Sequence, residues 1–69
     1  MEAEEWGRRI RAFRKLKGYT QAQLAESLGI SLSILGEIER GNRLPNETVI
    51  EQVAQVLGIT VDELIKFND

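Results

Sequence analysis

The chain has 69 residues, enough for one small domain, and it contains neither Cys nor His. These absences exclude disulfides, thiolate metal sites and histidine-based catalysis, so we expect no metal, no cofactor and no enzymatic activity. Hydrophobic residues make up 42% and charged residues 29%, the balance of a folded globular chain, while the formal charge of −2 argues by itself against a nucleic-acid partner.

Charged residues are unevenly distributed along the chain. Acids dominate the first five residues and the last third, whereas positions 8–17 hold six Lys and Arg side chains and no acid. A basic run of this kind is typical either of a solvated helix face or of a surface that meets an anionic partner. No apolar stretch reaches the roughly 20 residues of a membrane helix, and the acidic start is unlike a signal peptide. We therefore expect a cytoplasmic protein with no membrane partner.

Turn-forming residues divide the chain into five pieces of helical length, and none of the pieces alternates in the way that a strand does. These residues are Gly18, Gly29, Gly41 with Asn42, Pro45 with Asn46, and Gly58. We predict an all-α fold in which residues 1–69 form a single domain of five helices.

The first predicted helix carries an apolar stripe. Trp6, Ile10 and Phe13 have the i, i+4, i+7 spacing of one helix face, and Leu16 lies close to the same stripe. Gly18 is expected to end the helix. Trp6 suits either packing inside the domain or an interface.

Two short helices follow, separated by only three residues. Thr20 and Gln23 form the capping box of one helix, Gly29 suits its left-handed end, and Ser31 is the N-cap of the next. The expected inward positions of the pair are Leu24, Ala25, Leu28, Leu35 and Ile38. Such a pair is either a helix-turn-helix, whose second helix can enter the major groove of DNA, or an αα-hairpin with no DNA role.

The last two predicted helices also begin at caps. Asn46 follows Pro45 as the N-cap of one, and Thr60 with Glu63 forms the capping box of the other. The expected inward positions are Ile50, Val53, Ala54, Leu57 and Leu64. The helical pattern does not clearly bury four other apolar residues, namely Val49, Val56, Val61 and Phe67.

Several motifs occur in a fixed order between Ile10 and Ile65. They are Arg14, Thr20-Gln21, Leu24-Ala25, Gly29-Ile30-Ser31, Ile38-Glu39-Arg40-Gly41, Pro45 and Leu57-Gly58-Ile59. In these residues the chain resembles the Cro-type, or XRE-type, helix-turn-helix family, to which the repressors of phages lambda and 434 belong. The resemblance implies a compact five-helix lambda-repressor-like domain over residues 10–65, with the helix-turn-helix motif at 21–40 and the recognition helix at 32–40. It also implies a sequence-specific DNA-binding transcriptional regulator, and favours a repressor that binds a palindromic operator as a dimer.

The resemblance assigns roles to individual residues. Gln21 is expected to meet a phosphate and to brace the recognition helix, although it can also simply face solvent. Asn42 and Arg43 are expected at the sugar-phosphate backbone, and Arg14 and Glu39 as a structural ion pair between the first and third helices. The residues implied at the DNA are Gln21, Ser31, Leu32, Ser33, Ile34, Gly36, Glu37, Asn42 and Arg43.

The outer face of the predicted recognition helix lacks Arg, Lys, Asn and Gln, the side chains that usually read bases. Leu32 and Ile34 can instead pack against thymine methyl groups, Ser33 can bond to a base or a phosphate, and Glu37 can accept from cytosine N4. Gly36 lets a backbone come close to DNA or to a partner, unless it has no role at all. Glu37 is therefore the residue that counts most clearly against a nucleic-acid partner, because it is an acid expected inside the groove.

The sequence also suggests two kinds of contact with other protein chains. If Leu32 and Ile34 are both exposed, they also suit a degenerate helix-turn-helix that mainly binds a partner protein, such as another regulator or a toxin. The family resemblance places a homodimer contact in the last two helices, with Val61, Asp62 and Ile65 as the candidates. Salt separates the two functions, because binding to DNA phosphates weakens steeply as salt rises and an apolar protein contact does not.

Overall fold

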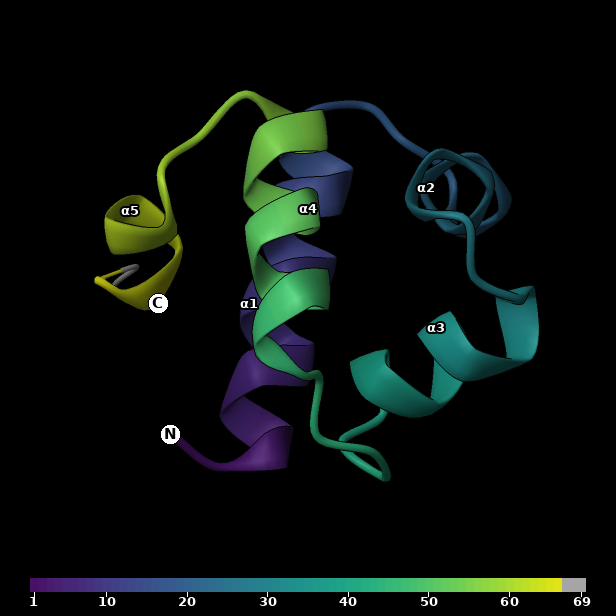
Figure 1. Cartoon of the computed structure of the whole chain (residues 1–69), viewed down its shortest axis with the longest axis horizontal. Helices are drawn as coiled ribbons and strands as arrows, with labels where there is room; N and C mark the ends of the chain where they lie inside the picture. Colours follow the sequence, from purple (N-terminus) through teal and green to yellow (C-terminus); the bar gives the residue numbers. More distant parts are fainter. Residues whose placement is uncertain (67–69) are drawn as a thin grey trace.

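A computed structural model of the chain describes residues 1–66 (Figure 1). Its helices are α1 (Ala3–Leu16), α2 (Gln21–Leu28), α3 (Leu32–Glu39), α4 (Glu47–Leu57) and α5 (Val61–Ile65). The predicted all-α arrangement of five helices is confirmed for the described residues, and Phe67 lies outside them. Within residues 1–66, every helix is too short or too polar to cross a lipid bilayer.

Helices α1 and α4 run through the middle of the molecule, with α2 and α3 on one side of them and α5 on the other (Figure 1). Helix α1 contacts α3, α4 and α5, and α2 contacts both α3 and α4. The first helix is thus the common support of both sides of the bundle.

The predicted caps are present. The Thr20 and Thr60 side chains accept from the amides of Gln23 and Glu63, and both reciprocal bonds of each capping box form. Ser31 accepts from the Ile34 amide, and the Asn46 side chain caps α4 in the same way. Each cap satisfies amides that the first turn of a helix leaves without intrahelical partners, so local sequence sets where these helices begin.

All five helices contribute side chains to one core. Its buried residues are Trp6, Ile10, Phe13, Leu24, Ala25, Leu28, Leu35, Ile38, Val53, Leu57 and Leu64, with Ile50, Val49 and Val56 packed partly against them. Trp6 therefore packs inside the domain. Leu16 differs from the expectation, because its side chain is 71% exposed. Helix α1 ends there, the chain turns at Gly18, and Tyr19 packs against the core in its place.

Helix α1 approaches the backbone of α3 very closely at Gly7. A methyl carbon at this position would lie 2.3 Å from the carbonyl oxygen of Ile38 and 2.7 Å from that of Glu39. Only a residue without a side chain fits this crossing. Gly7 thereby fixes how deeply the C-terminal end of α3 sits against α1, and the outward face of α3 follows from that contact.

Candidate nucleic-acid interface

Helices α2 and α3 form a helix-turn-helix unit. Gly29 ends α2 in the left-handed region at φ 70°, and the amide of Ile30 donates to the Ala25 carbonyl at 3.1 Å. Ser31 then begins α3, whose Leu35 and Ile38 are buried in the core. The short turn and the buried face of α3 together leave the opposite face of this helix toward solvent.

A three-residue brace holds the end of α3 against α1 and α2. Arg14 donates from Nε to Oε2 of Glu39 at 2.7 Å and from Nη2 to Oε1 at 2.9 Å, and the two side chains are only 9% and 3% exposed. Gln21 donates from Nε2 to the same Oε1 at 3.1 Å. The arginine also donates to the Tyr19 carbonyl at 3.0 Å, before the start of α2. Gln21 thus joins the ion pair instead of only facing solvent, and the brace fixes α3 relative to both preceding helices.

The outer face of α3 presents fewer apolar groups than the sequence indicates. Leu32 is 51% exposed and Ser33 is exposed, whereas Ile34 is half-buried and packs against the core. Ile34 lies four residues before Ile38 and so shares its inward-turned side of the helix. The expectation that Leu32 and Ile34 are both exposed is therefore wrong for Ile34.

Gly36 is covered by the side chain of Arg40. A methyl carbon at Gly36 would lie 3.0 Å from Nη1 of Arg40, and Gly36 itself is buried. Arg40, the residue that ends α3, is one helical turn further along the same face. The missing side chain at Gly36 therefore gives a guanidinium room to lie along the outer face of α3.

Glu37 is paired with Arg43 of the following loop. Oε2 of Glu37 accepts from Nε of Arg43 at 3.3 Å and from Nη2 at 3.2 Å. The backbone helps to bring the two together, because Gly41 has φ 81° and the Asn42 amide donates to the Glu37 carbonyl at 2.9 Å. Asn42 is exposed beside this turn. The one acid on the outer face of α3 thus has its charge balanced by an arginine.

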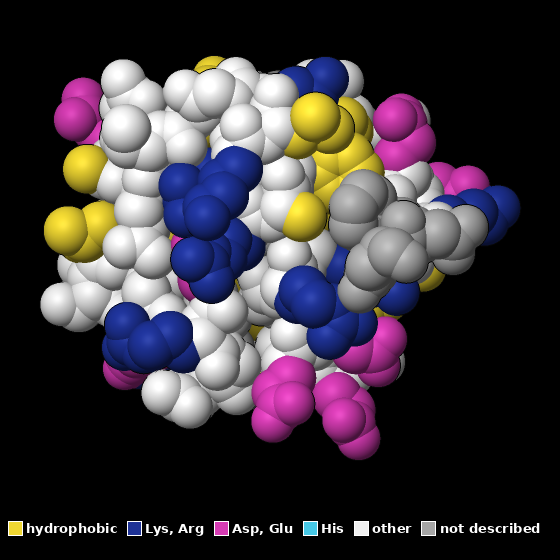
Figure 2. Space-filling model, turned by 180° about the vertical axis from the view of Figure 1, so that it is seen from behind, with side chains coloured by type: hydrophobic (Ala, Val, Ile, Leu, Met, Phe, Trp, Pro, Cys, Tyr) yellow, Lys and Arg dark blue, Asp and Glu magenta, His cyan; other side chains and the backbone are white. Residues whose placement is uncertain are grey.

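A shallow hollow next to α3 brings together two cations, Arg11 and Arg40, that are not among the residues expected at the DNA. Arg11, Arg14, Gln21, Glu39 and Arg40 line it. Arg14 and Glu39 pair with each other, but no carboxylate within residues 1–66 pairs with Arg11 or Arg40. Lys and Arg side chains lie across the middle of the face that contains α1, and acidic side chains lie mainly along its rim (Figure 2). The hollow also adjoins the N-terminus of α2, which favours anions.

The sequence profile of the helix-turn-helix family matches residues 10–64. The chain belongs to the XRE-type helix-turn-helix family of transcriptional regulators. It is 72% identical over 64 residues to the uncharacterized HTH-type transcriptional regulator YazB of Bacillus subtilis, covering 93% of each protein. It is also 44% identical to the immunity repressor of Bacillus phage phi105, covering 86% of this chain but 41% of the repressor.

Solved structures of XRE-type regulators have the same fold. The biofilm master regulator SinR, solved in complex with DNA, matches with a TM-score of 0.80 and 39% identity over 88% of this chain and 98% of that one. The restriction-modification controller protein C.AhdI of Aeromonas hydrophila matches with a TM-score of 0.84 and 35% identity, over 90% and 94% of the two chains. At these identities the likeness supports the family assignment as well as the fold.

In this XRE-type domain the candidate dimer residues lie on α5. Ile65 is 41% exposed, Val61 is half-buried, and Asp62 pairs with Lys66 at 3.1 Å on the surface. Arg9 of α1 donates to the Ile65 carbonyl at 2.6 Å and so ties the end of α5 to α1. The structure thus presents α5 as an anchored element with a partly apolar surface.

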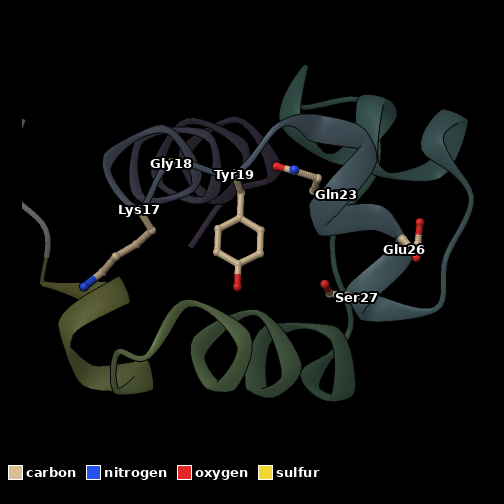
Figure 3. Close-up of a pocket in the computed structure, with 6 residues that line it drawn as sticks. All are labelled: Lys17, Gly18, Tyr19, Gln23, Glu26 and Ser27. Carbon is tan, nitrogen blue, oxygen red and sulfur yellow. The ribbon is translucent and has the colours of Figure 1, made fainter.

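A second hollow of the XRE-type domain lies beside α2 and the turn that precedes it (Figure 3). Its lining residues are Lys17, Gly18, Tyr19, Gln23, Glu26 and Ser27. The Tyr19 ring projects into it, and its hydroxyl donates to the Val56 carbonyl at 3.5 Å. No residue of α3 lines this hollow, so it lies apart from the surface around the recognition helix.

The roles of Arg11, Arg40 and Gly7 in the XRE-type site were not identified from the sequence. Arg11 belongs to the basic run at positions 8–17, but its place in the run does not reveal that it faces Arg40 across a hollow. Gly7 carries no motif at all, and its role follows only from the crossing of α1 and α3. For Arg40 a usable signal existed, because it is a basic residue at the end of the predicted recognition helix.

Proposed function

We propose that the chain is a repressor that binds a two-fold symmetric DNA operator as a homodimer in the cytoplasm, with α3 in the major groove of each half-site. The observation that carries the proposal is the placement of unpaired cations. Arg11 and Arg40 share a hollow beside α3 and have no carboxylate partner within the described residues. Such a site suits a backbone phosphate, which the net charge of −2 would otherwise repel.

The proposed contacts divide into two groups. Gln21, Arg11, Arg40 and Asn42 contact phosphates together with the N-terminal amides of α2, and they supply affinity for any sequence. The exposed part of α3 faces the base edges, with the N-cap Ser31, Leu32 and Ser33 at its start and Glu37 further along. Gly36 acts by admitting the side chain of Arg40, and Ile34 supports α3 from the core side.

A protein partner in place of DNA was the alternative function for this surface. It depends on Leu32 and Ile34 forming an apolar patch, and with Ile34 packed inward only Leu32 of this pair is left exposed, at 51%. The regulator SinR has been solved with DNA and also in a complex with SinI, so a protein partner of a related domain does not by itself argue against DNA. The cationic hollow favours DNA for this chain.

The test is a selection of bound duplexes from random DNA at two salt concentrations. We expect a motif with two half-sites about 10 base pairs apart, and an affinity that falls steeply as salt rises. Arg40→Ala should weaken binding to all sequences and reduce the salt slope by about 1. Lys17→Ala is the matched control, because it removes an exposed cation that lines the hollow away from α3. Recovery of no motif at low salt would contradict the proposal.

The homodimer has its own test. We propose that Val61, Asp62 and Ile65 lie in the contact between the two copies, since Ile65 is the most exposed apolar residue of α5. Ile65→Glu should shift sedimentation toward the monomer and lower operator affinity while Trp6 stays buried, as its fluorescence reports. Unchanged sedimentation would place the contact elsewhere.

A further inference from the structure

The ion pair between Glu37 and Arg43 changes what the outer face of α3 offers to DNA. A carboxylate alone only accepts hydrogen bonds and would select a donor such as cytosine N4. Here a single oxygen, Oε2, already accepts two bonds from Arg43. The side chains are 35% and 51% exposed, so the pair stands at the surface where a base edge would meet it.

The arginine retains the donors that guanine requires. A guanidinium has five N–H donors, and a bidentate contact to guanine O6 and N7 uses two of them. Glu37 takes one hydrogen from Nε and one from Nη2. Three hydrogens therefore remain on the two terminal nitrogens, and the carboxylate limits the rotation of the side chain that carries them.

Electrostatics favour the pair over the isolated acid. Duplex DNA carries one negative charge for about every 1.7 Å of its axis, so an unpaired carboxylate in the groove is repelled from both sides. Pairing makes the Glu37 side chain part of a neutral unit, in which Arg43 keeps free donors and Oε1 of Glu37 takes no part in either bond. Arg40 on the same face differs, because it has no carboxylate partner within residues 1–66 and lines the hollow with Gln21.

We propose that Arg43 reads a guanine edge in the major groove, and that Glu37 is a positioning residue that holds the Arg43 guanidinium in place. This inference rests on the proposed function, in which α3 lies in the groove. It makes Arg43 a determinant of sequence preference instead of a phosphate contact, and it makes Glu37 act through Arg43 instead of through cytosine.

The experiment measures the relative affinity of each variant for all four base pairs at every position of the motif that the wild-type protein selects. Arg43→Ala and Glu37→Ala should both remove the preference at the same base pair, by about 5- to 150-fold, the range of one bidentate contact. The double variant should lose no more than either single one, because the two residues act as a unit. Glu37→Gln should keep part of the base preference that Glu37→Ala loses, since its amide oxygen can still accept from Arg43.

Salt dependence supplies a second readout that separates the roles. The double variant removes a neutral pair and should leave the salt slope unchanged, whereas Arg40→Ala should lower it by about 1 and weaken all sequences alike. The inference is overturned if Glu37→Ala and Arg43→Ala act on different base pairs, if their effects multiply, or if the double variant lowers the salt slope. A wild-type protein that selects no motif would instead refute the proposed function, and this inference with it.

Discussion

Gly7→Ala tests whether the close crossing of α1 and α3 sets the position of the recognition helix. The new methyl carbon would lie 2.3 Å from the Ile38 oxygen, where ordinary contact begins at 3.4 Å, so the two backbones must separate by about 1 Å. Both neighbouring oxygens belong to the backbone, and no side-chain rotation can relieve the overlap. Overpacking of this kind costs about 1–3 kcal/mol, against a gain of about 1 kcal/mol from replacing a helical Gly by Ala.

The matched control is Gly36→Ala, the same substitution in another helix. Its methyl group would meet only the guanidinium of Arg40, at 3.0 Å, and that flexible side chain can move away. We therefore expect Gly36→Ala to stabilise the fold by up to about 1 kcal/mol and Gly7→Ala to destabilise it by up to about 2 kcal/mol. In a domain of this length each 1 kcal/mol corresponds to about 4–8 °C in Tm.

Urea and thermal unfolding, followed through the fluorescence of the buried Trp6 at fixed protein concentration, measure both variants. Gly7→Ala should also lower the affinity for DNA of every sequence, because α3 shifts as a whole. If Gly7→Ala were as stable as Gly36→Ala, the crossing would be looser than described and the inferred support of α3 by α1 would fail.

Other changes test the brace and the last cap. Glu39→Ala should cost about 3–5 kcal/mol because it leaves the buried Arg14 charge unpaired, whereas Lys66→Ala, which breaks an exposed pair, should change stability by under 1 kcal/mol. Urea unfolding compares the two, and equal losses would contradict the burial argument. Thr60→Ala should cost about 1 kcal/mol by removing the α5 cap, and amide hydrogen exchange should show faster exchange in α5 than in α3. Uniform acceleration across the domain would mean that α5 does not open locally.

Local signals made most of the fold predictable. The capping residues Thr20 and Thr60 define their helices within a few positions along the chain, and the structure forms both boxes. Apolar spacing likewise identified Ile10 and Leu35 as core residues. The expected burial of Leu16 was wrong because the apolar periodicity of α1 continues past the point where neighbouring helices still cover it.

The arrangement of the candidate site depended on contacts that no local pattern contains. Arg14 and Glu39 are 25 residues apart, and only the family resemblance suggested their pairing. The pairing of Glu37 with Arg43 depends on how the loop turns at Gly41, and the placement of Arg40 depends on the empty position at Gly36. Sequence reasoning could name these side chains but not how they combine, because the combinations depend on how the helices pack and on how the chain turns after α3.

The bond from Arg9 to the end of α5 has a mechanical consequence. Helix α1 is bonded to the end of α5 through Arg9 and packs closely on α3 at Gly7, so it connects the candidate dimer surface on α5 to the recognition helix. In a dimer paired through α5, α1 would therefore set the separation of the two recognition helices. The half-site spacing that such a dimer tolerates would then be a property of α1, and substitutions that bend this helix should change the preferred spacing while leaving the preferred bases unchanged.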